Sequence, residues 1–144
     1  MANKAPEWEH LEEFEKIASQ LVEKYPRWAD IDVSKLICYA ITNKNKPKAK
    51  VKPYDMSGEG APECFTNTKQ YFVKVFKGDW ESMYPELKQW VVASALDRID
   101  PEQPGKIGPL DYRDQSVMVK TAGADWHNRA DLPSLLTTTV EFRE

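Results

Sequence analysis

The fold is decided by residues 70–99, which read QYFVKVFKGDWESMYPELKQWVVASALDRI. The first eight of these residues, Gln70 to Lys77, are rich in aromatic and β-branched side chains, and this composition predicts a strand. Gly78-Asp79 then breaks the strand, because both residues favour turns over extended structure. The sequence therefore predicts a strand that turns sharply into the next element.

That next element is a long helix, which we expect to run from about Ser82 or Tyr84 to Ile99. Pro85 is tolerated in the first turn, where a backbone N–H would have no partner inside the helix. Asp100-Pro101 then ends the helix. The helical period of 3.6 residues places several side chains on one face: Leu87, Trp90, Val91, Ser94 and Arg98.

The elements around this stretch are predicted from their periodicity. Trp8 to Tyr25 has the spacing of an amphipathic helix and lies between Pro6 and Pro26, while Leu36 to Thr42 is short and apolar, as in a buried strand. Tyr54 to Thr68 is expected to be a loop. The last segments predict a strand at Ile107–Arg113, a helix at Asp114–Ala122 and a final strand at Thr137–Phe142. We expect an α+β fold over residues 1–144, with a small mixed or antiparallel sheet and the two long helices packed on one face.

Composition restricts the classes of function. With 41% hydrophobic and 30% charged residues, the 144-residue chain is typical of a soluble globular protein of one domain. A formal net charge of −3 argues against nucleic-acid binding through the whole surface. The N-terminus has no apolar run and no segment is long enough to cross a bilayer, so we expect a cytoplasmic protein with no membrane partner. Cys38 and Cys64 are too few for a disulfide framework, and Cys38 is expected to be a buried free thiol.

A basic segment follows the strand at Leu36–Thr42. Its five lysines occupy alternate positions and would share one face of an extended chain: Lys44, Lys46, Lys48, Lys50 and Lys52. With Tyr54 and Tyr71 nearby, this segment is a candidate for contacting nucleic acid. The alternative is an edge or loop that lysines keep from unwanted strand pairing.

Two further groups of residues have more than one interpretation. Trp8, Trp28 and Trp126 are compatible with a protein-binding hot spot, but core packing is expected for at least two of them. His127, together with Asp111, is compatible with acid–base chemistry, although a single histidine in a loop is more often structural.

The order of these elements resembles a family of small phage-encoded metallopeptidases with a minimal zincin-like fold. The resemblance runs from about Phe14 to Trp126. It rests on short anchors spread over the predicted elements: Leu21–Tyr25, Phe72–Val75, Asp79-Trp80, Leu96 and Pro109–Asp111. It implies a zincin-like core over about residues 8–127 and a C-terminal extension over 128–144.

In that family the second helix carries H-E-x-x-H, whose two histidines bind zinc while the glutamate acts as general base. The resemblance places Ser94 and Arg98 at the histidine positions, Ala95 at the glutamate and Leu110, followed by Asp111, at the third histidine. The chain's two histidines, His10 and His127, lie outside this helix. We therefore expect no zinc and no other cofactor. If Arg98 is buried, a pair with Asp111 or Asp97 is expected; otherwise Arg98 reaches water at the helix end.

The resemblance favours a catalytically inactive metallopeptidase-like phage protein that acts as a protein-binding module. The expected partner is a host protein or protein complex, such as a host enzyme or an anti-phage defence complex that the chain inhibits in the host cytoplasm. The alternative is a nucleic-acid-binding accessory protein that uses Lys44 to Lys52.

Overall fold

The computed structural model describes residues 7–42, 54–58, 69–102, 118, 121–122, 126 and 129–142. Its sheet has four strands: β1 (Glu7–His10), β2 (Leu36–Thr42), β3 (Asp55–Ser57) and β4 (Tyr71–Phe76). The strand order is β1-β2-β4-β3, and the sheet is mixed, because β2 and β4 are parallel while β1 and β3 are antiparallel to their neighbours. The fold is therefore α+β.

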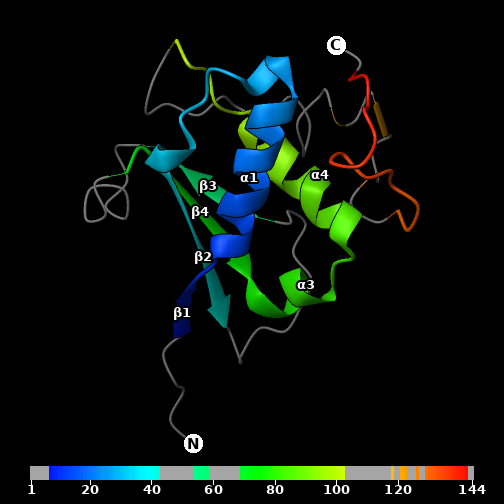
Figure 1. Cartoon of the computed structure of the whole chain (residues 1–144). Helices are drawn as coiled ribbons and strands as arrows, with labels where there is room; N and C mark the ends of the chain where they lie inside the picture. The colour runs from blue at the N-terminus through cyan, green and yellow to red at the C-terminus, as the bar shows by residue number, and fades with distance from the viewer. Residues whose placement is uncertain are drawn as a thin grey trace, which may run out of the picture.

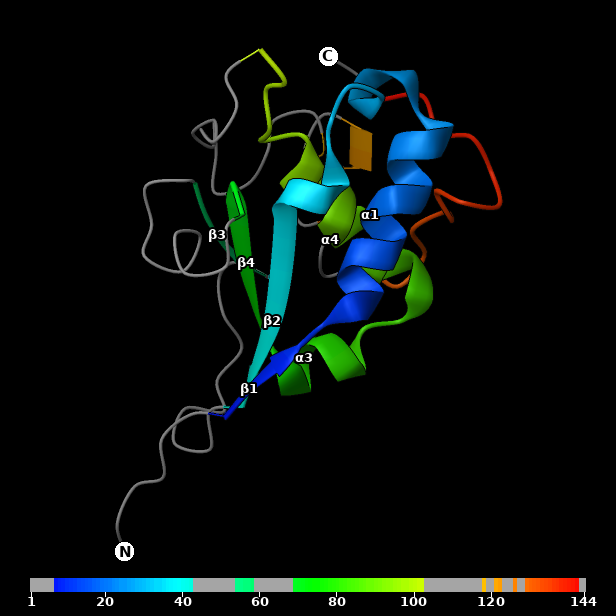
Figure 2. The same cartoon turned by 60° about the vertical axis from the view of Figure 1, so that its left-hand side comes forward.

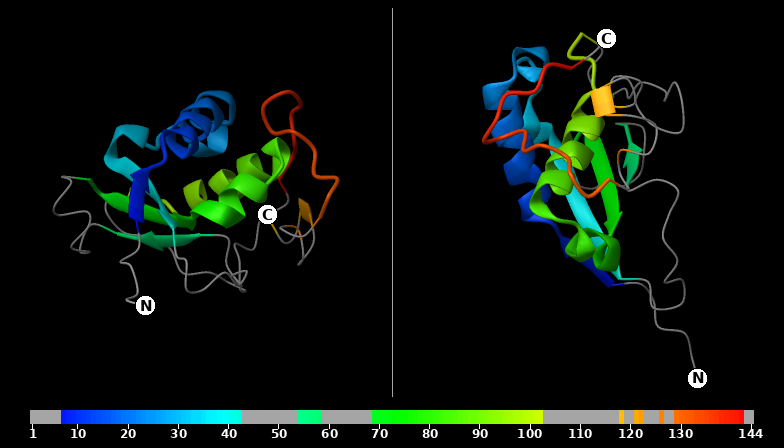
Figure 3. Two further views of the ribbon diagram at one scale, coloured as in Figure 1. Left: turned by 90° about the horizontal axis from the view of Figure 1, so that it is seen from below. Right: turned by 90° about the vertical axis from the view of Figure 1, so that its right-hand side faces the viewer.

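The helices α1 (Glu12–Lys24) and α4 (Pro85–Leu96) lie on the same side of the sheet (Figures 1 and 3). The short helix α3 (Lys77–Ser82) follows β4 directly and leads into α4. Two single-turn 3₁₀ helices, η1 (Pro26–Trp28) and η2 (Val33–Lys35), connect α1 to β2. The expected arrangement of two long helices on one face is confirmed.

The main core fills the space between this face and the helices. Because side chains alternate along a strand, Leu36, Cys38 and Ala40 of β2 point toward the helices, together with Val73 and Val75 of β4. The opposite face carries a second, small apolar cluster formed by Ile37 and Phe72, with Tyr39 packed against it. Every residue of α4 from Trp90 to Leu96 is buried, so this helix is the centre of the core.

Several bounds agree with the sequence. The strand β2 has the predicted limits, and β4 lies within Gln70–Lys77. The second long helix begins at Pro85, which occupies its first turn as expected, and ends at Leu96, three residues before the predicted end. Cys38 is buried and free, also as predicted.

Three predictions are wrong. Trp8 to His10 form the edge strand β1 and not the first turn of the helix, because their backbone pairs with Tyr39 to Ile41 of β2. The predicted loop at Tyr54–Thr68 contains the strand β3, which pairs with β4. The segment Thr137–Phe142 is not a strand.

Side chains of α1 explain the conformation of that C-terminal segment. The Lys24 ammonium donates to the carbonyls of Leu135 (2.8 Å), Leu136 (3.1 Å) and Thr138. The Tyr25 hydroxyl donates to Leu135 O at 2.8 Å and accepts from the Val140 N–H at 3.2 Å. Two backbone groups of the predicted strand, the Thr138 carbonyl and the Val140 N–H, are therefore bonded to Lys24 and Tyr25 at the end of α1. Phe142 packs edge-on against Trp28 and Trp90.

The strand predicted at Ile107–Arg113 and most of the helix predicted at Asp114–Ala122 lie outside the described residues. Among the helices that the structure describes, none is long and apolar enough to cross a bilayer.

Candidate functional site

Two of the positions that the resemblance assigns to a metal site, Ser94 and Ala95, are packed inside the protein, while Arg98 lies beyond the end of α4. Ser94, Ala95 and Leu96 have no exposed surface. The hydroxyl of Ser94 lies 3.1 Å from the hydroxyl of Tyr54, which precedes β3 and is itself 6% exposed. A buried hydroxyl needs such a partner, because leaving it unbonded costs about 1–3 kcal/mol. The Ser94–Tyr54 pair thus joins the helix layer to the far edge of the sheet.

The zinc that the resemblance implies does not fit these residues. The hydroxyl at Ser94 is bonded to a tyrosine, and the methyl of Ala95 offers neither a ligand nor a base, so neither side chain presents the groups that bind zinc in peptidases. Leu110 and Asp111 lie outside the described residues. Within the part of the chain that the structure describes, no group of three or more His, Cys, Asp or Glu residues could hold a metal ion.

The end of α4 is tied to the turn after α1 by a charged contact. Asp97 accepts from the Arg27 guanidinium, at 2.7 Å from Nη2 and 3.1 Å from Nε, and from the Trp28 indole N–H at 3.2 Å. Asp97 is one of the two carboxylates expected to pair with Arg98, and the structure places it against Arg27. Arg98 itself is half-buried and makes contacts of its own. These bonds give Asp97 a structural role.

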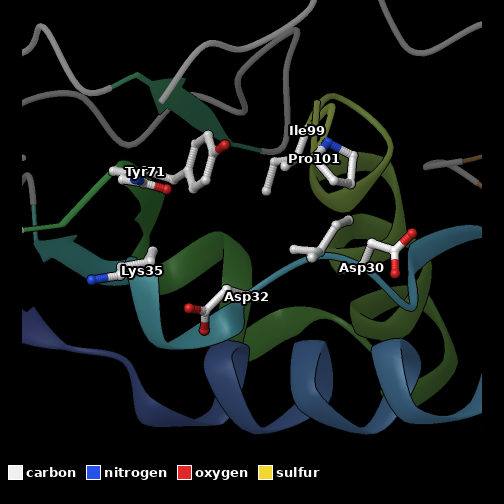
Figure 4. A pocket seen from close by; sticks show the side chains of 8 residues that line it. Asp30, Asp32, Lys35, Tyr71, Ile99 and Pro101 are labelled. Atoms are coloured by element: carbon white, nitrogen blue, oxygen red, sulfur yellow. The ribbon is translucent and has the colours of Figure 1, made fainter. Parts of the chain in front are cut away.

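A hollow of about 240 Å³ opens beyond the end of α4, next to the first residues of β2 and β4 (Figure 4). Tyr71, Ile99 and Pro101 lie on one side of it, and Lys35, Asp32 and Asp30 lie on the other. Sites for small molecules usually have volumes of about 300–1,000 Å³. The hollow is therefore somewhat smaller than a usual small-molecule site.

The lowered pKa of Asp32, which lines this hollow, is explained by hydrogen bonds within its own turn. The N–H and hydroxyl of Ser34 both donate to Asp32, at 3.0 and 2.6 Å, and these bonds lower the pKa of Asp32. The same bonds cap the η2 turn, as short polar side chains commonly do. The charge on Asp32 thus holds the turn in place, and no described group in the hollow is set up as a nucleophile with its base.

The thiol of Cys38 is also unsuited to chemistry. Burial and the nearby Glu15 carboxylate raise its pKa far above the usual range, so the thiol stays protonated at neutral pH. His127, the other residue considered for catalysis, lies outside the described residues.

The predicted nucleic-acid site is only partly described. Lys44, Lys46, Lys48, Lys50 and Lys52 lie outside the described residues. Tyr54 and Tyr71 are 6% and 3% exposed, so their rings are not available for stacking on bases. Base stacking by Tyr54 or Tyr71 is therefore not supported, and the lysines of the hypothesis remain a prediction.

Among the described residues, Trp8 is the exposed large aromatic side chain, and it was predicted to lie in a helix. At 50% exposure, it is the large hydrophobic side chain that the described part of the chain presents to solvent. Trp28 and Trp126 are buried, at 1% and 0%, which confirms that at least two of the three tryptophans belong to the core. The alternation of Trp8 and His10 with Glu7 and Glu9 was the available signal for an edge strand with one apolar face.

Comparison with protein-family models, with curated proteins and with solved structures gives no match to this chain. Its resemblance to the phage metallopeptidases therefore remains a prediction from the order of its elements and its short anchors.

Proposed function

We propose that this chain is a catalytically inactive, zincin-like relative of the phage metallopeptidases that works by binding another protein. The observation that carries the proposal is the packing of Ser94 and Ala95, which are fully buried where an active relative would present a zinc ligand and a general base. Their environment is that of core residues, and the Ser94 hydroxyl is bonded to Tyr54.

The proposed partner is a host enzyme or a host defence complex that the chain inhibits. Binding needs only a stable surface, so the packed interior around α4 is compatible with it, whereas zinc-dependent hydrolysis would need accessible zinc ligands. The exposed Trp8 supports this proposal, because tryptophan is the residue type most enriched among interface hot spots.

The experiment is affinity capture of host proteins by the full-length chain, followed by titration of each captured protein, once purified, against the purified chain. The proposal predicts one host protein or complex that binds with a Kd of about 1 µM or tighter, equivalent to about −8 kcal/mol. A Trp126→Phe chain, which is altered inside the core and keeps its surface, is the control and should capture the same host protein. Failure of every purified candidate to bind, or zinc-dependent cleavage of a peptide library, would overturn the proposal.

A further inference from the structure

The strand β1 is an open edge of the sheet. It stands first in the order β1-β2-β4-β3 and has a neighbour on one side only within the described strands (Figure 2). The backbone groups of a terminal strand that point away from its neighbour can pair with an added strand. The local structure thus offers a place where an extended segment of another protein can bind.

Trp8 gives this edge a fixed apolar anchor. Its ring lies 6.3 Å from the ring of Tyr39 and 6.1 Å from that of Phe72, measured between centroids, so one side of the indole rests on the outer face of the sheet. Half of the residue stays exposed. A supported aromatic ring loses little conformational freedom on binding, which is the property of an interface anchor.

Among the described residues, those at and just after β1 are mostly acidic. Residues 7–15 contain five glutamates and no lysine or arginine. The side chains of Glu9, Glu12 and Glu13 are 63%, 85% and 50% exposed. Lys77 pairs with Glu9 at 2.9 Å and Lys88 with Glu13 at 3.1 Å, while Glu12 has a 3.8 Å contact with His10. Among the described residues of this edge, the carboxylates exceed the cations that pair with them, so these residues suit a positively charged partner.

We propose that β1 binds an extended, basic segment of the partner protein by strand addition. The proposal rests on the protein-binding function and names the chemistry of the partner. In the added strand, alternate side chains would face the two sides of the sheet. Those on the helix side meet Glu9, whose strand partner Ala40 faces the helices, and those on the outer side meet Trp8. The recognised segment therefore alternates lysine or arginine with aliphatic residues.

A second copy of this chain is a poorer occupant. Pairing β1 with β1 brings two glutamate-rich edges together, and like charges facing one another across strands destabilise the pair. Nucleic acid is disfavoured for the same reason, because its phosphates would approach exposed carboxylates. Both remain outcomes that the test distinguishes.

The test titrates the full-length chain with the peptide acetyl-Lys-Val-Arg-Val-Lys-Val-Arg-amide at low and high salt. Two matched peptides serve as controls: one with glutamate at every basic position, and one with the central valine changed to proline, which keeps the charge but cannot pair fully. The proposal predicts binding of the basic peptide, weakened about tenfold by either change. Equal binding of the proline peptide would overturn strand addition, and equal binding of the acidic peptide would overturn the charge argument.

Variants of the chain locate the site. Trp8→Ala is expected to weaken the basic peptide about tenfold or more, and Glu12→Lys about fivefold. Glu23→Lys, an exposed change near the other end of α1, should leave binding unchanged. Glu12 is 85% exposed, so its variant keeps the fold even if Trp8→Ala lowers stability. Binding of the basic peptide by both variants as strongly as by the unaltered chain would overturn the proposal. It would also be overturned if the unaltered chain formed a dimer that Trp8→Ala abolished, which would make a second copy the occupant of β1. Competition between oligothymidylate and the peptide would instead make nucleic acid the occupant and would overturn it as well.

Host capture separates this proposal from the function on which it rests. If Trp8→Ala and Glu12→Lys capture the same host protein as strongly as the unaltered chain, the binding function stands and the β1 site is wrong. If the unaltered chain captures no partner that binds again when purified, the binding function fails.

Discussion

The hydrogen bond between Ser94 and Tyr54 predicts a measurable coupling between two residues that lie 40 positions apart in the sequence. The perturbation is a double-mutant cycle of Ser94→Ala, Tyr54→Phe and the chain carrying both. Each change removes one hydroxyl oxygen and leaves the rest of the side chain in place. Because both residues make further contacts, the single variants report more than this bond, whereas the cycle isolates the pair.

The magnitude follows from burial. Ser94 has no exposed surface and Tyr54 is 6% exposed, so neither hydroxyl regains full hydration when its partner is removed. A neutral hydrogen bond of this kind contributes about 0.5–1.5 kcal/mol, and we expect a coupling of about 1 kcal/mol. For a chain of this length, 1 kcal/mol corresponds to about 4 °C in Tm.

The assay is urea unfolding of all four chains, followed by circular dichroism and by tryptophan fluorescence to check that the transition is two-state. Distant sites add to within about 0.3–0.5 kcal/mol. A coupling below about 0.3 kcal/mol would show that the Ser94 hydroxyl is not bonded to Tyr54, and would contradict the contact between α4 and the residue before β3.

Three further predictions concern the core, the pH dependence and the C-terminal segment. Ala95→Glu places a carboxyl where no surface is exposed and should lower the free energy of unfolding in urea by about 3 kcal/mol or more. Ala29→Glu, the same change at an exposed residue, should lower it by less than about 0.5 kcal/mol, and equal effects would contradict the burial of Ala95. Burial alone would raise the pKa of Glu13, but hydrogen bonds from Trp80 (2.7 Å) and Lys88 (3.1 Å) outweigh burial and lower that pKa. The Glu13 carboxylate therefore stabilises the fold above pH 4.5 and ceases to do so as pH falls through its lowered folded pKa. The stability lost in Glu13→Gln at pH 7 should disappear in strong acid, and a pH-independent difference would refute this. Phe142→Ala should lower the free energy of unfolding by about 2 kcal/mol, because the Phe142 ring contacts those of Tyr25, Trp28 and Trp90. The loss should be smaller than for a fully buried phenylalanine, because Phe142 is only half-buried. Thr139→Ala, at an exposed position, is the control, and an equal loss there would contradict a specific role for Phe142.

The parts of the fold with a strong period were predictable from the sequence. β2, β4, α1 and α4 have either consecutive apolar residues or a 3.6-residue spacing, and Pro85 marks the start of α4. The end of β4 was expected at Gly78-Asp79, but the short helix α3, which contains both residues, was not predicted.

The remainder depends on contacts between distant residues. β1 directly precedes α1, so Trp8 fits the helical spacing as well as it fits an edge strand, and only pairing with β2 decides between them. β3 has three residues inside a turn-rich segment and no period of its own. The threonine-rich tail favours a strand locally, but the Thr138 carbonyl accepts from Lys24 and the Val140 N–H donates to Tyr25.

The same limit applies to the candidate site. Ser94, Ala95 and Arg98 are not the histidines and glutamate of a zinc-binding H-E-x-x-H helix, so the prediction that no such site is present could be made from sequence alone. Tyr54 as the partner of Ser94, and Arg27 as the partner of Asp97, are set by tertiary packing. The exposure of Trp8 follows from its place on an edge strand, which the sequence left ambiguous.

The most direct test of the central claim is the zinc content of the purified full-length chain, measured after removal of any histidine tag and dialysis against zinc. The packed helix α4, which contains no histidine, predicts far less than one zinc per chain and a Tm that a chelator does not change. One tightly held zinc per chain, together with a Tm that falls on chelation, would contradict the claim that this helix is structural and that the protein acts by binding.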